Sequence, residues 1–171
     1  MGEGRIDAGS SSVDPKLIGE ADIVIFALYP KVFKAWIKEN QQYFKSGAYI
    51  TDVTGVKGCI VREIQDMLRD DVEFISSHPM AGRETSGVMN SDDKVFYGAN
   101  YIIVPTEKNT KEGIDVCREI GLIKHMEIHN VTKLLKVQFL FLYNTQIHHD
   151  SVLYLFDLEF HHHHLGKFLS N

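Results

Sequence analysis

Short apolar stretches of strand length alternate along residues 21–75 with longer stretches in which apolar residues recur at helical spacing. The first stretch, 21–28, is nearly all apolar, which is typical of a strand buried on both faces of a parallel sheet. Strand starts recur about every 25 residues, the size of a strand–helix–strand unit with short loops. The predicted elements are strands at 21–28, 48–53 and 72–75 and helices at 31–45 and 60–68.

The same alternation extends through the first 129 residues. Asp14-Pro15 is a helix-start signal, which predicts a single turn to Glu20 after a Gly- and Ser-rich loop. Because right-handed crossovers place consecutive strands side by side, residues 1–129 are predicted to form a Rossmann-like domain. Its class is α/β, a mostly parallel sheet flanked by helices. Further elements are expected as a short helix within 88–98, a strand at 99–104, a helix at 109–120 and a strand at 122–128.

The pattern changes at about Asn130, beyond which apolar residues show neither helical nor strand period. Residues 130–171 are therefore predicted to form an irregular tail, a divergent or truncated end. We interpret the run from His161 to His164 as an incidental tract, because four adjacent imidazoles cannot all face one ion. His148-His149 also lacks the spacing of a metal motif, so no metal site is assigned.

The ends of the three predicted parallel strands carry most of the candidate chemistry. Such ends meet at one edge of a sheet, where ligands bind in α/β folds. His78 follows the third strand, and it is the only histidine in the first 124 residues. Its pKa lies near working pH, which suits an acid or base. The alternative at this point is an ordinary loop histidine in a turn that begins a helix.

Composition narrows the classes of partner. A chain of 171 residues with 44% hydrophobic residues suits one globular domain, or one domain and part of a second. A net charge of −5 gives no electrostatic case for nucleic acid or an anionic membrane, and no apolar run reaches membrane-spanning length. Two cysteines without a CxxC motif and a start without an apolar leader favour a reducing cytoplasm.

Four segments, taken in order, resemble the prephenate dehydrogenase family, whose members convert prephenate to 4-hydroxyphenylpyruvate with NAD or NADP in tyrosine biosynthesis. The most specific of them is His78-Pro79-Met80-Ala81-Gly82-Arg83-Glu84-Thr85-Ser86-Gly87. Each segment alone is weak, but their shared order across roughly residues 4–128 is a strong signal. The other three are Ala21 to Pro30, Thr51 to Gly58 and Tyr97 to Thr106.

The resemblance implies a role for each matched residue. His78 would accept the proton of the prephenate ring hydroxyl as the hydroxyl becomes a ketone, with Thr54 supplying a catalytic hydroxyl. Alternatives remain for three residues: Glu84 as a first-turn helix carboxylate, Asp52 as a structural carboxylate and Lys57 as a solvated lysine. The implied substrate-binding residues are Glu84, Gly82 and Lys57, and the implied cofactor-binding residues are Tyr29, Pro30, Asp52, Thr54 and Gly55.

The chain departs from the family in three respects. Gly55 stands where many relatives have serine. The chain has no G-x-G-x-x-G phosphate-binding motif, and residues 130–171 do not resemble the helical domain through which the family forms homodimers and completes the prephenate site. The resemblance therefore implies that residues 1–129 are an incomplete Rossmann-like dinucleotide-binding domain, which lacks the family's first strand–helix–strand unit. We expect weak dinucleotide binding and little turnover from this chain by itself.

Two other functions remain open from the sequence. The chain is alternatively a non-catalytic remnant or interaction module that self-associates through an exposed sheet edge, since the first strand would lack a partner. A related hydride-transfer enzyme, such as a 3-hydroxyacid dehydrogenase, is a more distant alternative.

Overall fold

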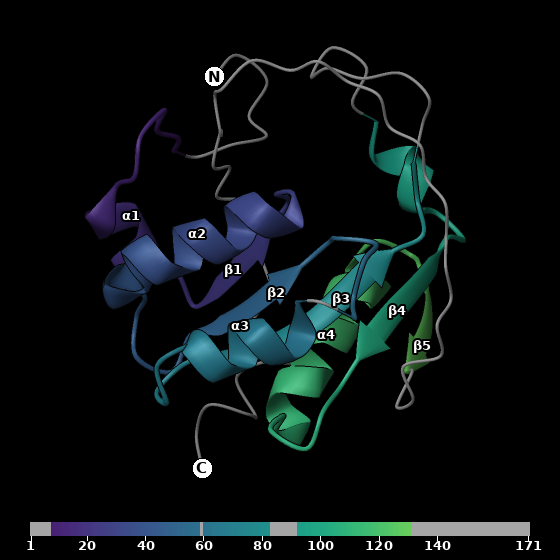
Figure 1. Cartoon of the computed structure of the whole chain (residues 1–171). Helices are drawn as coiled ribbons and strands as arrows, with labels where there is room; N and C mark the ends of the chain where they lie inside the picture. The colour runs from purple at the N-terminus through teal and green to yellow at the C-terminus, as the bar shows by residue number, and fades with distance from the viewer. Residues whose placement is uncertain (1–7, 59, 83–91, 131–171) are drawn as a thin grey trace.

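A single five-stranded sheet organises the computed structural model, which describes residues 8–58, 60–82 and 92–130 (Figure 1). The strands lie in chain order, each beside the strand that follows it. They are β1 (Ile23–Phe26), β2 (Tyr49–Asp52), β3 (Glu73–Pro79), β4 (Asn100–Val104) and β5 (Glu127–Asn130). The helices are α1 (Pro15–Glu20), α2 (Pro30–Asn40), α3 (Val61–Met67) and α4 (Lys111–Ile123), with short 3₁₀ turns η1 (Gln41–Tyr43) and η3 (Asp93–Phe96).

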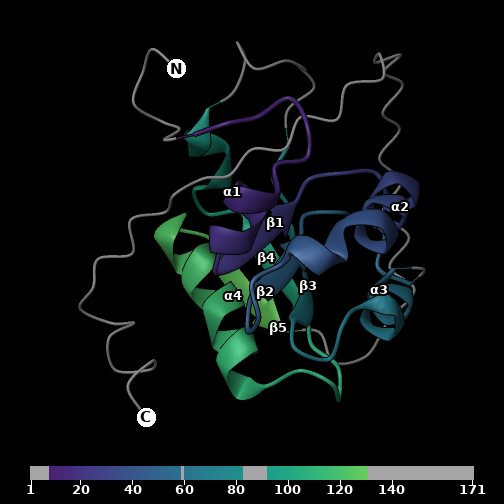
Figure 2. The same ribbon diagram turned by 90° about the vertical axis from the view of Figure 1, so that its left-hand side faces the viewer.

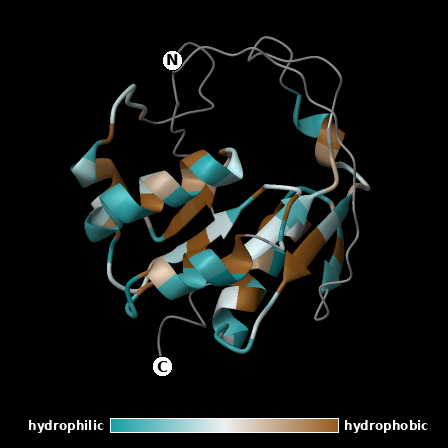
Figure 3. Ribbon diagram, in the orientation of Figure 1, coloured by the Kyte–Doolittle hydropathy of each residue, from teal (hydrophilic) through white to brown (hydrophobic). Residues whose placement is uncertain are grey.

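The sheet separates two apolar cores. Helices α2 and α3 cover one face and α4 covers the other (Figure 2). Alternate residues of each strand face opposite sides: Val24 and Phe26 join the α2–α3 core, whereas Ile23 and Ile25 pack toward the α4 core. Coloured by hydropathy, β1 is apolar throughout, while exposed turns of the helices are polar (Figure 3). The fold therefore confirms the predicted α/β sheet flanked by helices.

The first helix forms for the reason that the sequence indicates. The Asp14 carboxylate accepts hydrogen bonds from the backbone N–H groups of Lys16, at 2.9 Å, and Leu17, at 3.2 Å. Pro15 occupies the first helical position, where no backbone donor is needed. The second helix is shorter than predicted, because the chain tightens into η1 after Asn40.

The third strand is longer than predicted, and His78 lies within it rather than after it. Its first half pairs in parallel with β2 as far as Ser76, and its second half pairs with β4 in the antiparallel direction. Antiparallel hydrogen bonds to β4 therefore keep the polar segment Ser76–Pro79 extended. The prediction that the strand ends at Ile75 was wrong, because it relied on apolar residues alone.

The last helix and strand are also displaced from the prediction. Leu122 and Ile123 belong to α4, not to the fifth strand, and the helix stops before His125, whose φ of 55° is left-handed. Gly121 lets the helix approach β4, since a Cβ there would lie 2.7 Å from Cδ1 of Tyr101. Asn130, assigned to the tail from sequence, ends β5. The rest of the predicted tail lies outside the described residues.

Gly113 is a packing position whose substitution tests the contact between α4 and the sheet. A Cβ at Gly113 would lie 2.6 Å from Oε1 of Glu73 and 2.9 Å from Cδ1 of Ile75. Gly113→Ala is expected to lower the free energy of unfolding by about 1–3 kcal/mol, because overpacking outweighs the gain in helix propensity. Urea unfolding measures the change. The control Gly19→Ala in α1, where the nearest atom is 3.4 Å away, should be neutral or stabilising.

Candidate active site at the carboxyl ends of β2 and β3

The parallel strands bring the predicted strand-end residues to one edge of the sheet. Phe26, the last residue of β1, pairs with Asp52, the last of β2, which in turn pairs with Ser76 of β3. The backbone N–H of Val53 donates to the Phe26 carbonyl at 3.0 Å, which extends the contact beyond the strands. The predicted convergence of strand ends on His78 is confirmed for β2 and β3.

Asp52 is the polar centre of this edge. Its side chain is fully buried, and its carboxylate accepts hydrogen bonds from both neighbouring segments. From β3 it accepts the Ser76 hydroxyl at 2.7 Å and the Ser77 backbone N–H at 3.2 Å. From the following loop it accepts the Thr54 backbone N–H at 3.1 Å and the Thr54 hydroxyl. These donors stabilise a charge that burial would otherwise make costly.

Lys57 completes the charge balance around Asp52. Its Nζ lies 2.9 Å from Oδ2 and 3.1 Å from Oδ1 of Asp52, and it donates to the Ser77 carbonyl oxygen at 2.5 Å. The Lys57 side chain is 10% exposed. Burial lowers the pKa of Lys57, and the carboxylate of Asp52 opposes that effect. The ammonium group thus contacts protein oxygens that it must leave if it is to bind a substrate anion.

His78 has one nitrogen bound to the protein and the other beside a glycine. Nδ1 lies 2.7 Å from the carbonyl oxygen of Val53, which can only accept a hydrogen bond. In the neutral ring Nδ1 therefore carries the proton, and Nε2 keeps its lone pair. A Cβ on Gly55 would lie 3.6 Å from Nε2, so the glycine places no side chain against this nitrogen. The geometry suits a base at Nε2.

The environment of His78 favours its neutral form. Burial lowers the pKa of the imidazole; the hydrogen bond to Val53 and the charge of Asp52 raise it, and the charge of Lys57 lowers it further. The balance is a pKa below the ordinary value of about 6.5. Nε2 is therefore available as a proton acceptor at neutral pH.

A depressed pKa at His78 makes part of the folding stability depend on pH. Below about pH 6.5 the unfolded chain takes up a proton at this position more readily than the folded chain. The stabilisation is complete above that pH and is lost as pH falls through the folded pKa. Urea unfolding at neutral pH and below pH 6 should show a smaller loss of stability in His78→Gln than in the unsubstituted chain. Equal losses would contradict the assignment.

The remaining predicted residues divide into those at the site and those apart from it. Thr54 is at the site, with its hydroxyl directed to Asp52. Tyr29 and Pro30 begin α2, where Tyr29 is 65% exposed, and Gly82 is an exposed residue after β3. Glu84 lies outside the described residues. The roles assigned to all of these residues stay predictions.

A chain of buried hydroxyl groups lies beneath the site and was missed from the sequence. The Ser77 hydroxyl lies 2.7 Å from the hydroxyl of Tyr101 and 2.8 Å from that of Thr51. Cys117 Sγ donates to Thr51 on the α4 side at 3.8 Å, and burial raises its pKa to about 12, so the thiol is unreactive. Hydroxyl residues inside otherwise apolar strands, at Thr51 and Ser76-Ser77, were the available signal.

The described residues match the implied dinucleotide in one respect only. Nε2 of His78 adjoins Gly55, which places no side chain there, and a Cβ at Gly55 would lie 3.6 Å from that nitrogen. Among the described residues, the start of α2 does not provide a binding site for the pyrophosphate. This helix begins with Pro30, which has no N–H to donate, and no glycine-rich turn precedes it. The same ranges contain no cluster of three metal-ligating side chains and no helix suited to crossing a membrane.

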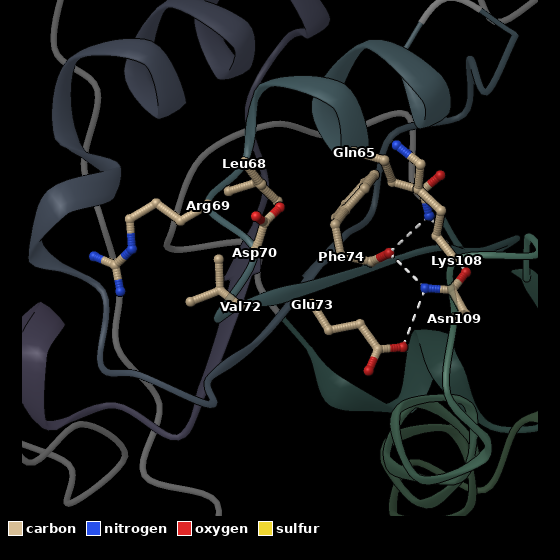
Figure 4. A pocket seen from close by; sticks show the side chains of 9 residues that line it. All are labelled: Gln65, Leu68, Arg69, Asp70, Val72, Glu73, Phe74, Lys108 and Asn109. Carbon is tan, nitrogen blue, oxygen red and sulfur yellow. Dashed lines mark hydrogen bonds between the residues drawn. The ribbon is translucent and has the colours of Figure 1, made fainter.

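A separate hollow of about 240 Å³ lies at the opposite end of β3 (Figure 4). Asn109 there donates to Glu73, at 3.2 Å, and to the Phe74 carbonyl, at 2.8 Å. The cations on its rim already have partners, since Lys108 pairs with Asp66 and Arg69 with Asp71. These contacts anchor the start of α4, and we assign this hollow no catalytic role.

Residues 3–127 match the family model described as prephenate dehydrogenase, nucleotide-binding domain. The chain is 35% identical over 95 residues to a prephenate dehydrogenase from Lactococcus lactis, covering 54% of this chain and 27% of that protein. It is 33% identical over 82 residues to the Bacillus subtilis prephenate dehydrogenase, covering 48% and 22% respectively. The chain thus spans about a quarter of the length of these relatives.

Solved structures share the fold. The crystal structure of prephenate dehydrogenase from Aquifex aeolicus superimposes with a TM-score of 0.63 at 24% identity, over 70% of this chain and 43% of that one. The same protein has been solved in complex with hydroxyphenyl propionate and NAD⁺, with the same TM-score. A Synechocystis arogenate dehydrogenase also matches at 0.63, over 42% of its length.

Proposed function

The chain belongs to the family of prephenate dehydrogenase nucleotide-binding domains, and from this premise we propose that it carries the proton-accepting half of a prephenate dehydrogenase active site. The reaction is the oxidative decarboxylation of prephenate to 4-hydroxyphenylpyruvate with NAD or NADP. The observation that supports this assignment is the state of His78, whose Nδ1 is bound to Val53 and whose Nε2 faces Gly55.

The chemistry at His78 follows from that geometry. The ring hydroxyl of prephenate would donate to Nε2, and the proton would pass to the imidazole as the hydroxyl-bearing carbon becomes a ketone. A bound nicotinamide ring supplies the acceptor for the hydride that leaves this carbon. Carbon dioxide then departs, the electrons of the broken carbon–carbon bond make the ring aromatic, and the phenolate oxygen so formed would take the proton back from the imidazolium. Because Val53 holds Nδ1–H, the imidazolium that forms remains hydrogen-bonded on that side.

The other implied residues would surround this reaction. We propose that Gly82, Glu84 and Lys57 bind prephenate and that Tyr29, Pro30, Asp52, Thr54 and Gly55 border the NAD or NADP. For Lys57 and Asp52 the contacts favour an indirect role, since each has the other as its partner. The homodimer of the full-length family remains a proposal for this protein.

Reduction of NAD⁺ or NADP⁺ that depends on prephenate tests the proposed activity. We expect a slow rate that requires both compounds and high concentrations of cofactor, because no pyrophosphate cradle is seen among the described residues. The product should be 4-hydroxyphenylpyruvate, identified by mass spectrometry. Reduction of cofactor by other hydroxy acids but not by prephenate would instead favour a 3-hydroxyacid dehydrogenase.

Self-association is a second candidate, supported by the edge position of β1. Within the described ranges β1 pairs only with β2, and its four residues are all apolar. The opposite edge strand, β5, carries Glu127 and His129, which discourage pairing. Light scattering would show a dimer whose population rises with protein concentration. A monomer at all concentrations would exclude this candidate.

A further inference from the structure

Two segments hold His78 in place, and Asp52 contacts both of them. One segment is the loop after β2, where Val53 binds Nδ1 and Thr54 donates to Asp52. The other is β3 itself, where Ser76 and Ser77 donate to the same carboxylate. Asp52 therefore fixes the loop that carries the Val53 carbonyl relative to the strand that carries the imidazole.

Lys57 closes the same connection from the other direction. Its ammonium group bridges the Asp52 carboxylate and the carbonyl oxygen of Ser77, the residue directly before His78. The loop from Val53 to Lys57 is thus bound at its first residue to His78 itself and at its last residue to Ser77. Both charged side chains are buried, so water screens them weakly and their arrangement is well defined.

We propose that Asp52 and Lys57 are positioning residues that act as a pair: they hold the Val53 carbonyl against Nδ1 of His78 and thereby leave Nε2 as the basic nitrogen. The inference rests on the proposed function, because it assigns that nitrogen to the reaction. It deepens that function, because Asp52 and Lys57, which the resemblance implies to bind cofactor and substrate respectively, here orient the histidine that acts as the base.

The pair also sets the charge around the histidine. Among the described residues, the charged groups that act on His78 are Asp52 and Lys57, and on the adjacent strand β4 it is opposed by the apolar Ile102. The positive charge of Lys57 lowers the pKa of His78, and the negative charge of Asp52 raises it. Removing one charge should therefore shift the His78 pKa in a direction that depends on which charge is removed.

Opposite shifts distinguish positioning by a charge pair from a general structural role. Nuclear magnetic resonance titration of His78 in the full chain measures the pKa, with the resonance assigned by its loss in His78→Gln. We expect Lys57→Gln to raise the pKa by about one unit and Asp52→Asn to lower it by about one unit. The double variant, in which neither charge remains, should return close to the original value.

Two further variants serve as controls. Ser76→Ala removes a hydrogen bond to Asp52 but leaves both charges, so the His78 pKa should change little. If Asp52→Asn does not fold, Lys57→Arg, which keeps the charge, is compared with Lys57→Gln. Shifts in the same direction for both single-charge variants, or equal values for Lys57→Arg and Lys57→Gln, would overturn the proposal.

The experiment separates this inference from the proposed function, because it is performed without prephenate or cofactor. Opposite pKa shifts of His78, found together with no prephenate-dependent reduction of NAD⁺ or NADP⁺ in the separate activity assay, would support the positioning pair and reject the proposed function. Prephenate-dependent reduction of cofactor without opposite pKa shifts would support the proposed function and reject the positioning pair. The tautomer, read from the ¹⁵N shifts of His78, should change from Nδ1–H toward a mixture in Lys57→Gln; an unchanged tautomer would count against the pair.

Discussion

Asp52→Ala is expected to lower the free energy of unfolding by about 3–5 kcal/mol, which is a large part of the stability of a domain of this size. The substitution leaves the buried ammonium of Lys57 without its counter-ion. It also removes the acceptor used by Ser76, Ser77 and Thr54. Urea unfolding followed by circular dichroism measures the loss.

The matched control is a carboxylate of the same kind in an exposed ion pair. Asp66 in α3 lies 2.6 Å from Lys108, with side chains that are 69% and 51% exposed. Asp66→Ala should cost less than about 1 kcal/mol, because water solvates both charges after the change. Similar losses for Asp52→Ala and Asp66→Ala would show that the buried network does not stabilise the domain.

His78→Gln is expected to reduce prephenate-dependent formation of NADH or NADPH by about 10²–10⁴-fold, the usual contribution of a general base. Glutamine is close to histidine in size and offers an amide, but it cannot accept the hydroxyl proton at neutral pH. Nicotinamide absorbance at high protein and cofactor concentration measures the rate.

A second histidine provides the control for this substitution. His129 in β5 is exposed, lies 2.8 Å from Oδ1 of Asn100, and is separated from His78 by β4, whose Ile102 pairs with both histidines. His129→Gln should leave the rate unchanged. A rate in His78→Gln equal to that of the unsubstituted chain would place the base elsewhere.

The parallel part of the fold was predictable because its signals are local. Apolar residues concentrated at 21–28 and 48–53 mark strands that are buried between two helical layers, and Asp14-Pro15 marks a helix start. Parallel connections then bring the strand ends together without further information. This reasoning was enough to place His78 beside the end of β2.

The rest depends on contacts between distant segments, which a single sequence does not reveal. The polar residues of β3 stay extended because they form antiparallel pairs with β4. Lys57 reads as a surface lysine until Asp52 and the Ser77 carbonyl are placed around it. The last helix was likewise predicted to end at residue 120, whereas it continues through Gly121, whose lack of a side chain admits the ring of Tyr101.

The most direct test of the account is a titration of the chain with prephenate, observed at the ring nitrogens of His78 by ¹⁵N nuclear magnetic resonance. We predict that in the free chain Nδ1 is protonated and Nε2 is not, and that prephenate shifts the Nε2 resonance saturably as its hydroxyl donates to that nitrogen. A protonated Nε2 in the free chain at neutral pH, or an Nε2 resonance that prephenate leaves unchanged, would contradict the assignment of His78 as the proton acceptor.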